Sequence, residues 1–275
     1  MARITALIIK ARCTFQKGAY CVRKLIVVKR VYQLYKYVRQ YLLYLWEFME
    51  FIKISRIRSD FTIGWKDRYP CLNDKTTSTS FDRHYVFHTA WAARCVVQYK
   101  PTKHIDISSS LYFCSILSAY VPVEFYDYRP AKLDLDNLKS QHGDLLHLPF
   151  KDGEVSSISC MHVIEHVGLG RYGDCLDSVG DLRAIAELRR VLAPNGHLLF
   201  VVPVGQQKVA FNAHRIYSYE QIVGYFSDLM LNEFSLIPDT EIAGGLVRHA
   251  DPSLVKIQNY ACGCFWFQKP ASNVI

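Results

Sequence analysis

The sequence predicts an α/β protein in which helices cover both faces of a doubly wound, mostly parallel sheet. Two observations predict this fold. Segments with helical spacing alternate with short apolar runs from residue 84 to residue 275, which is typical of strand–helix–strand units. One of these runs, HLLFVVPV at 197–204, is apolar at nearly every position, as expected of a strand that is covered on both faces.

The individual elements follow from periodicity and from turn residues. The segment GDLRAIAELRRVL at 180–192 has the apolar spacing of an amphipathic helix, and a PNG turn ends it. Ser218 is a suitable N-cap for the helix after the 197–204 strand. In chain order we predict a helix at 84–99, a strand at 103–107, a helix at 111–120, strands at 123–128 and 158–164, a helix at 180–192, a strand at 197–204, a helix at 218–229, and closing strands at 232–239 and 260–268.

The first sixty residues differ from the rest of the chain in charge. They hold thirteen Lys and Arg against three Asp and Glu, whereas the remaining residues hold twenty against twenty-two. We therefore divide the chain into a basic, aromatic-rich helical extension at 1–60, a polar linker at 61–83 and an α/β domain at 84–275. The domain is nearly neutral and the extension carries no recognisable nucleic-acid module, so we expect no nucleic-acid partner.

Three interpretations of the basic extension stay open. A mitochondrial-type presequence agrees with its Arg content and its lack of acidic residues before Glu47. A helix on an anionic membrane surface agrees with the mixture of aromatic residues and cations at 27–48. The third is a helix that packs on the domain. A membrane-spanning helix is disfavoured, because the longest apolar run, YLLYLW, is too short to span a bilayer. We expect a cytoplasmic protein, with peripheral membrane contact through residues 1–50 and mitochondrial targeting as open alternatives.

The nine cysteines give no sign of a disulfide framework or a metal site. They are scattered, and no two of them form a C-x-x-C pair. This pattern indicates free thiols in a reducing compartment. Cys262 and Cys264 alternate along a predicted strand, so we interpret both as small buried residues and expect no metal site.

Polar residues follow the first two predicted strands of the domain. Asp106 closes the first strand, and a turn of small residues, Ser108–Ser110, leads into the next helix. Such a turn lets backbone amides approach a ligand, although glycine is usual there and Ser110 could simply cap the helix. Asp127 ends the second strand, where an acidic residue can accept hydrogen bonds from both hydroxyls of a ribose.

The middle of the domain resembles the class I S-adenosylmethionine-dependent methyltransferases, which have a Rossmann-like fold. The resemblance rests on GDLLHLPFKDGEVSSISC at 143–160, on CMHVIEHV at 160–167 and on AELRRVLAPNGHLLFVVP at 186–203. Two further blocks, EHVGLGRYGD at 165–174 and FNAHRIY at 211–217, are similar to a methyltransferase-like family of unknown function. That narrower similarity extends over roughly residues 100–225.

The resemblance implies S-adenosylmethionine as cofactor and assigns residues to it. One departure is that Ser108 stands where the family favours glycine, and a Cβ atom there could narrow the pocket or oppose a positive φ. The implied cofactor residues are Asp106, Ser108 and Ser109 near the methionine portion, Asp127 at the ribose, Asp144 and Leu145 at the adenine, and His162 near the sulfonium.

Glu165 and His166 follow the fourth strand of the resemblance, where a methyl acceptor would lie. Alternation sends the two side chains to opposite sides if the strand continues. Histidine titrates near neutrality, so His166 or His214 is the predicted general base, with Glu165 as a third catalytic candidate. A metal held by His162 and His166, and a purely structural role for Glu165 and His166, are the alternatives.

The loops after the fourth and fifth strands should face each other across one cleft. We predict that they bind an acceptor with hydroxyls and an anionic group, either a small polar molecule or a glycan. The alternative is that Asn212 and Arg215 only hold the loop by bonding backbone carbonyls. The predicted acceptor-binding residues are Arg171, Tyr172, Asn212, Arg215 and Tyr217.

Two functions therefore compete. The first is an S-adenosylmethionine-dependent methyltransferase for a small polar or glycan-type acceptor. The second is a catalytically inactive methyltransferase fold that serves as a binding or scaffolding protein, because its serine-filled turn no longer holds the cofactor. A nicotinamide oxidoreductase is disfavoured, since DISSSL lacks the G-x-G-x-x-G turn.

Overall fold

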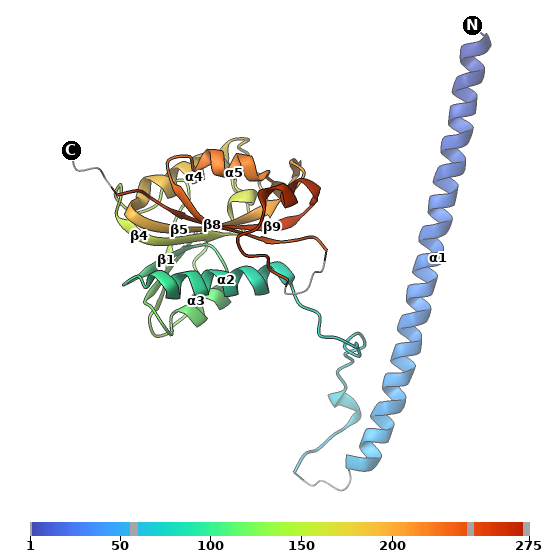
Figure 1. Ribbon diagram of the computed structural model, residues 1–275. Coiled ribbons are helices and arrows are strands. Elements are labelled where there is room, and N and C mark those ends of the chain that lie inside the picture. The colour runs from blue at the N-terminus through green and yellow to red at the C-terminus, as the bar shows by residue number, and fades with distance from the viewer. Residues whose placement is uncertain (1, 56–59, 241–244, 272–275) are drawn as a thin grey trace. The chain divides into compact units, whose positions relative to one another are not determined.

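The computed structural model describes residues 2–55, 60–240 and 245–271, with side chains described from residue 28 onward. The chain divides into two compact units, residues 1–80 and 81–275, each of which is described by itself (Figure 1).

The first unit consists of one long helix and the segment that follows it. Helix α1 spans Ala2–Ser55, and a short 3-10 helix spans Trp65–Asp67. The ring of Trp65 meets the ring of Phe48 edge-on at 5.9 Å, and the Gln40 side chain donates a hydrogen bond to the carbonyl of Leu72. Part of the predicted linker thus packs on α1. Among the described residues, no helix has the length and apolar character of a membrane span. Peripheral membrane contact through residues 1–50 stays a prediction.

The second unit is built on a seven-stranded sheet in the order β3-β2-β1-β4-β5-β9-β8. The first five strands of this order are parallel, and β9 runs antiparallel to both β5 and β8. The predicted mostly parallel sheet is confirmed. The strands are β1 His104–Ile107, β2 Val123–Asp127, β3 Leu138–His142, β4 Val155–Met161, β5 Leu192–Val204, β8 Met230–Ile237 and β9 Ala261–Gln268, with a separate hairpin of β6 Lys208–Ala210 and β7 His214–Ile216.

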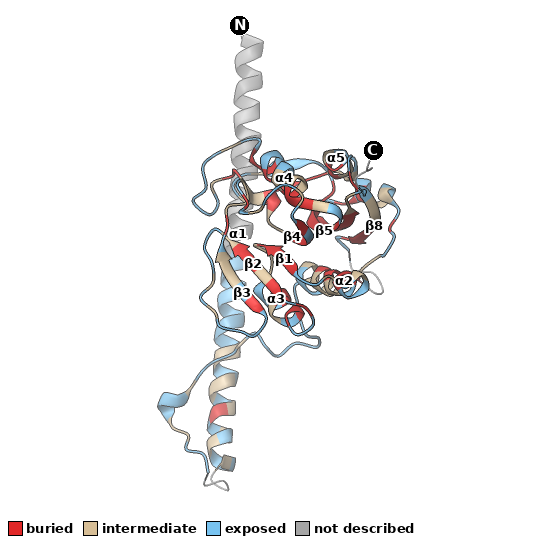
Figure 2. Ribbon diagram, turned by 90° about the vertical axis from the view of Figure 1, so that its left-hand side faces the viewer, coloured by how far each residue is buried: buried red, intermediate tan, exposed pale blue. Residues whose placement is uncertain are grey.

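Helices cover both faces of this sheet (Figure 1). On one face lie α2 (Arg83–Tyr99) and α3 (Leu111–Leu117), and on the other lie α4 (Gly180–Val191) and α5 (Tyr219–Tyr225). The predicted N-cap of α5 is confirmed, because the Ser218 hydroxyl accepts a hydrogen bond from the amide of Gln221. Buried residues concentrate along the strands and on the sides of the helices that face them (Figure 2).

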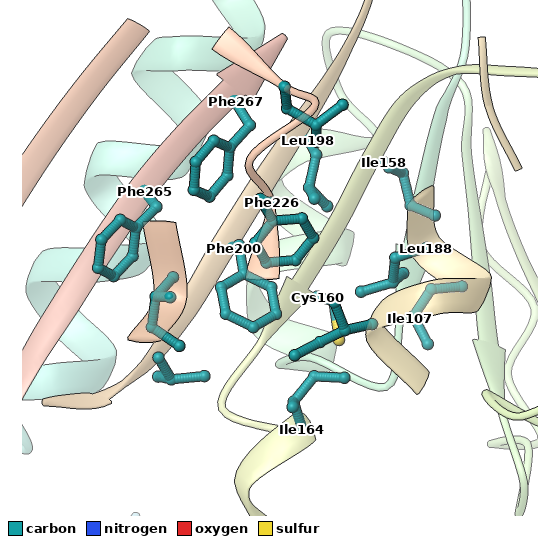
Figure 3. Packing of buried hydrophobic residues seen from close by; sticks show 14 of the residues in the cluster. Ile107, Ile158, Cys160, Ile164, Leu188, Leu198, Phe200, Phe226, Phe265 and Phe267 are labelled. Carbon is teal, nitrogen blue, oxygen red and sulfur yellow. The ribbon is translucent and has the colours of Figure 1, made fainter. Parts of the chain in front are cut away.

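Two apolar cores hold the helices against the sheet. Figure 3 shows the core beneath α4 and α5, where Phe200, Phe226, Phe265 and Phe267 pack together with Leu188. The Phe226 ring lies 4.9 Å from Phe200 and 4.8 Å from Phe267, between centroids. The second core joins α2 and α3 to the opposite face of the sheet. Burying each aromatic side chain contributes roughly 2–3 kcal/mol.

A buried carboxylate links α2 to β8. Glu233 in β8 accepts hydrogen bonds from the indole of Trp91 and from the guanidinium of Arg248, and its side chain is 2% exposed. Burial alone would raise the pKa of this carboxyl, but hydrogen bonds from Arg248, Ser235 and Trp91 outweigh it and lower the pKa from 4.5 to about 2. The folded state therefore favours the ionised carboxylate.

Replacing Arg248 with methionine is expected to destabilise the fold by about 3 kcal/mol near neutral pH. This is the low end of the range for a broken buried ion pair, because Arg248 itself is half-exposed. Because the folded pKa of Glu233 is depressed, its contribution is present above pH 4.5 and is lost as the pH falls toward about 2. Urea titrations across this range should show the variant and the wild type converging at acidic pH. A difference in the free energy of unfolding between variant and wild type that stays constant with pH would contradict this role of the Glu233 carboxylate.

Candidate functional site

The candidate site lies at the carboxyl ends of the parallel strands, where ligands bind to doubly wound sheets. The predicted residues follow β1, β2, β3, β4 and β5, and the sheet brings these strand ends to one edge. The structure separates the predicted residues into those that face this edge and those that are buried behind it.

Asp106 is buried behind the serine turn and does not face a ligand. One of its carboxylate oxygens accepts a hydrogen bond from the amide of Ser109 at 3.0 Å, and the other accepts one from the hydroxyl of Ser159 in β4. Burial raises the pKa of Asp106 to about 6, although these hydrogen bonds act in the opposite direction. The carboxylate of Asp106 is turned toward β4 and ties the turn to it, and its contact with the methionine portion of a cofactor stays a prediction.

Asp106 belongs to a buried polar chain that the sequence analysis missed. The imidazole of His104 bonds the hydroxyl of Ser157 at 2.6 Å and that of Ser159 at 2.9 Å. The hydroxyl of Tyr99 in α2 also bonds Ser157, at 3.0 Å. Burial lowers the pKa of His104 to about 3, so this imidazole is neutral. The chain joins α2, β1 and β4 beneath the site. The sequence did contain a sign of this chain, because polar residues stand at alternate positions of two apolar strands, at 104 and 106 in β1 and at 157 and 159 in β4.

The serine turn adopts the conformation that glycine would adopt. Ser108 has φ of +54°, and its amide and hydroxyl both donate to the carbonyl of Tyr126. The hydroxyl of Ser109 accepts a hydrogen bond from the amide of Met161 at 3.1 Å. Both hydroxyls are thus used within the fold. Ser109 thereby ties the turn to β4 through the oxygen of its hydroxyl.

Replacing Ser108 with glycine is expected to leave the fold as stable or to stabilise it by up to about 1 kcal/mol, because glycine adopts positive φ without steric cost. Replacing it with valine should destabilise the fold by about 2 kcal/mol, since a β-branched residue opposes this conformation. Urea denaturation of the two variants tests this. Equal destabilisation by both would show that the lost hydroxyl, and not backbone strain, matters at this position.

Asp127 and Asp144 face the open edge of the sheet. One oxygen of Asp127 accepts a hydrogen bond from the amide of Arg129 at 2.7 Å, and one oxygen of Asp144 accepts one from the amide of Leu146 at 2.9 Å. Within the described part of the chain, the second oxygen of each carboxylate has no hydrogen-bond partner. Leu145 packs partly buried against the core. These three residues lie together at the ends of β2 and β3, and their binding of a cofactor stays a prediction.

His162 is covered by the start of α2. Strand β4 ends at Met161, three residues earlier than predicted, because His162 adopts φ of +57°. Its side chain is 5% exposed and its ring stacks on those of His84 and Tyr85, with centroids 5.4 Å and 5.6 Å away. Residues of α2 thus occupy the space beside its ring, and contact of His162 with a cofactor stays a prediction.

Glu165 also lies inside the protein. The strand does not continue to it, and Ile164–His166 instead form a 3-10 turn. The Glu165 side chain is 1% exposed, and its Oε1 lies 2.8 Å from Nδ1 of His162. Its other oxygen has no hydrogen-bond partner among the described residues. The carboxylate contacts His162 inside the protein, and a catalytic role for Glu165 stays a prediction.

His166 has the geometry of a general base. Its Nδ1 lies 2.6 Å from the carbonyl oxygen of Ala213, which can only accept a hydrogen bond. Nδ1 therefore carries the proton, and Nε2 keeps a free lone pair. The side chain is 15% exposed, and Nε2 lies 3.8 Å from Glu165 Oε1, beyond hydrogen-bond distance. The fold thus fixes the tautomer that can accept a proton.

Exposed cations and an aromatic ring stand beside His166. Arg171 donates to the same Ala213 carbonyl at 3.0 Å, so its 3.2 Å approach to the protonated His166 Nδ1 is a contact between two donors. The Tyr172 ring meets the His166 ring edge-on at 5.7 Å. The guanidinium groups of Arg171 and Arg129 lie 5.1 Å and 5.0 Å from the Tyr172 centroid. Sequence reasoning missed Arg129. This residue lies two positions past Asp127 and brings the loop after β2 to the 167–177 loop.

A single carboxylate shapes the loop that carries Arg171 and Tyr172. Asp174 accepts hydrogen bonds from the amides of Gly168, Gly170 and Tyr172. Burial raises the pKa of Asp174, but these donors outweigh it and hold the pKa below its ordinary value. Gly168 has φ of +78°, and a Cβ there would lie 2.1 Å from the carbonyl oxygen of Asp177. The glycines are therefore needed for the turn itself.

Two predicted acceptor residues are structural. Arg215 is 8% exposed and donates to the carbonyls of Val167 and Asp177, with its Nε 3.5 Å from a carboxylate oxygen of Asp181. The hydroxyl of the buried Tyr217 donates to the same Asp181 at 2.9 Å. Predicting Arg215 and Tyr217 as acceptor-binding was wrong, since their polar groups are used inside the protein to hold the 167–177 loop.

The other two predicted residues of the FNAHRIY block, Asn212 and His214, reach the surface. Asn212 is exposed. His214 lies half-buried against the ring of Tyr260 at 4.6 Å, and burial lowers its pKa. A neutral imidazole is able to accept a proton, so His214 remains an alternative base.

The order of the strands in the sheet identifies the fold. Numbered along the chain, the seven strands of the sheet follow the order 3-2-1-4-5-7-6, in which the antiparallel last strand is inserted beside the fifth. This is the class I methyltransferase fold. A family described as Caenorhabditis protein of unknown function, DUF268, matches residues 152–237. The predicted similarity to a family of unknown function is confirmed there, while residues 100–151 lie outside the match.

Solved structures that are similar to this chain are distant from it in sequence. The N-methyltransferase NodS from Bradyrhizobium japonicum WM9 is 15% identical over 69% of this chain and 98% of its own, with a TM-score of 0.49. The 1,6-didemethyltoxoflavin-N1-methyltransferase from Burkholderia thailandensis, solved with 1,6-didemethyltoxoflavin and S-adenosylhomocysteine, is 8% identical over 68% of this chain and 80% of its own, with a TM-score of 0.48. Among curated proteins, none is similar in sequence to this chain.

Proposed function

We propose that the chain is an S-adenosylmethionine-dependent methyltransferase for a small polar or glycan-type acceptor. The observation that carries this proposal is His166. Its Nδ1 donates to the Ala213 carbonyl, Nε2 makes no hydrogen bond with the described residues, and the side chain is 15% exposed just past the carboxyl end of β4. A base in this position removes the proton from an acceptor hydroxyl as the methyl group is transferred.

The cofactor would lie along the ends of β1, β2 and β3. Asp127 supplies a carboxylate oxygen for the ribose hydroxyls, and Asp144 and Leu145 border the adenine. Positioning is the main contribution of such an enzyme, because the reactive methyl group belongs to the cofactor. The protein's residues orient the acceptor, exclude water and accept one proton.

The acceptor class follows from the side chains that remain exposed. Arg171, Arg129 and Tyr172 present two cations around one aromatic ring, and Asn212 adds an amide across the loops. Guanidinium groups favour carboxylate or phosphate, and an aromatic ring favours the flat face of a sugar or small ring. An acceptor that carries a hydroxyl beside an acidic group therefore agrees best with these residues.

Replacing Asp127 with asparagine is expected to weaken S-adenosylmethionine binding by about 10- to 100-fold, because charge-assisted hydrogen bonds to the ribose are lost. Asp134, an exposed residue in the same β2–β3 connection, provides the matched control, and Asp134→Asn should bind normally. Calorimetry on the full chain measures both affinities.

The same experiment separates the two functions. In the wild type, ligand at 100 times its dissociation constant should stabilise the fold by about 2.7 kcal/mol. No heat and no thermal stabilisation by S-adenosylmethionine or S-adenosylhomocysteine in folded wild-type protein would overturn the proposal. That result would favour a scaffolding protein with a methyltransferase fold.

A further inference from the structure

Three metal-binding side chains from distant parts of the chain meet at the start of α2. His84 lies in the first turn of α2, His162 directly follows β4, and Cys262 is the second residue of β9. One imidazole nitrogen from each histidine and the thiol sulfur all lie within 4.8 Å of one another. The sheet explains the meeting, because antiparallel β9 begins beside the carboxyl end of β5, next to the end of β4.

His162 presents an imidazole nitrogen that has no partner within the protein. Its Nδ1 lies 2.8 Å from Glu165 Oε1, and its Nε2 is buried with no hydrogen-bond partner among the described residues. The carboxylate accepts the proton of Nδ1, which leaves Nε2 as the nitrogen available to a metal. A buried polar atom without a partner costs about 1–3 kcal/mol. A carboxylate that bonds one nitrogen of a histidine while the other nitrogen binds a metal is a recurrent arrangement in metalloproteins.

The other two side chains are also suited to a metal. The ring of His84 stacks on that of His162 with centroids 5.4 Å apart, so the two imidazoles lie side by side. Cys262 is fully buried, so its thiol is shielded from solvent. A metal ion would displace the thiol proton, as it does at zinc sites in general. The Sγ of Cys264 lies 3.9 Å from that of Cys262, on the same face of β9.

We propose that His84, His162 and Cys262 bind one zinc ion, with Glu165 as the positioning residue that orients His162. Two imidazoles and one thiolate are a typical ligand type for zinc, and three protein ligands leave a fourth position for water or another ligand. The ion would connect α2, β9 and the residue after β4, where the ring of His84 already stacks on those of His162 and Tyr260. The proposal is independent of methyl transfer, because it concerns only metal binding by these side chains.

The test is metal binding by the full chain. The protein is stripped with a chelator and dialysed against zinc, and bound metal is measured by mass spectrometry. Wild type should bind about one zinc per chain, and Cys262→Ser and His84→Gln should each bind at least about tenfold more weakly. Glu165→Gln should weaken zinc binding by about 10- to 100-fold, because the hydrogen bond from His162 then goes to a neutral amide oxygen instead of a carboxylate. Cobalt substitution should give a thiolate-to-metal charge-transfer band that is absent in Cys262→Ser.

Cys160→Ser is the matched control, because Cys160 is an equally buried thiol that belongs to the core on the opposite face of the sheet. It should keep both the zinc and the cobalt band. His84 is only partly buried, so His84→Gln keeps the test decisive if Cys262→Ser does not fold, as judged by circular dichroism. Folded wild type that binds no zinc at micromolar concentration, or a folded Cys262→Ser or His84→Gln that binds it as tightly as wild type, would overturn the proposal.

Discussion

Replacing His166 with asparagine is expected to lower the rate of methyl transfer by about 10²- to 10⁴-fold, the range for loss of a general base. The asparagine amide can still donate to the Ala213 carbonyl in place of Nδ1, so the loop should keep its position. The variant lacks Nε2, whose lone pair is proposed to take the proton of the acceptor. The rate is measured with labelled S-adenosylmethionine and a panel of hydroxylated acids and phosphorylated sugars.

Two further variants separate catalysis from folding in this experiment. His249 is exposed and has φ of +47°, a conformation that asparagine tolerates, so His249→Asn should leave the rate unchanged. His214→Asn tests the alternative base. Cofactor affinity should stay the same in all three variants, since the cofactor residues lie along other strands. A larger loss of rate in His214→Asn than in His166→Asn would transfer the role of base to His214.

The fold was predictable because its signals are periodic and local. Strand β5 was identified by its continuous apolar run and α4 by its amphipathic spacing. Strand β3 was missed because its sequence, LKSQH, is polar, and only its position at the edge of the sheet allows this. The β6–β7 hairpin was missed for a similar reason, since each strand has three residues and carries no clear alternation.

The candidate site was predictable in position but not in the direction of its side chains. Sequence spacing correctly brought the residues after β2, β3, β4 and β5 to one edge. It could not show that α2 would cover His162, because that depends on packing between segments about eighty positions apart. It could have shown that Asp181 is buried, because Asp181 precedes Ile185 and Leu188 on the apolar face of α4. A buried carboxylate needs a partner, and Arg215 supplies it.

Arg215 is buried and Arg171 is exposed, and this difference gives a second large expected effect. Arg215→Met is expected to destabilise the fold by about 3–5 kcal/mol, because it leaves the carboxylate of Asp181 buried with only the Tyr217 hydroxyl as partner, and removes the donor to the Val167 and Asp177 carbonyls. Arg171→Met removes an exposed side chain, so its free energy of unfolding should stay within about 0.5 kcal/mol of wild type. Urea denaturation measures both.

Activity should rank these two variants differently from stability. Arg171 is free to contact an anionic group of the acceptor, so Arg171→Met should raise the KM for the acceptor by about tenfold while the protein remains as stable as wild type. Arg215→Met should lose activity only in proportion to the protein that unfolds or to the disorder of the 167–177 loop. A stable Arg215→Met with a raised KM would show that the guanidinium leaves Asp181 and reaches the acceptor, which would restore the prediction made from the FNAHRIY block. An Arg171→Met variant with unchanged KM would instead limit that side chain to its contact with the Ala213 carbonyl.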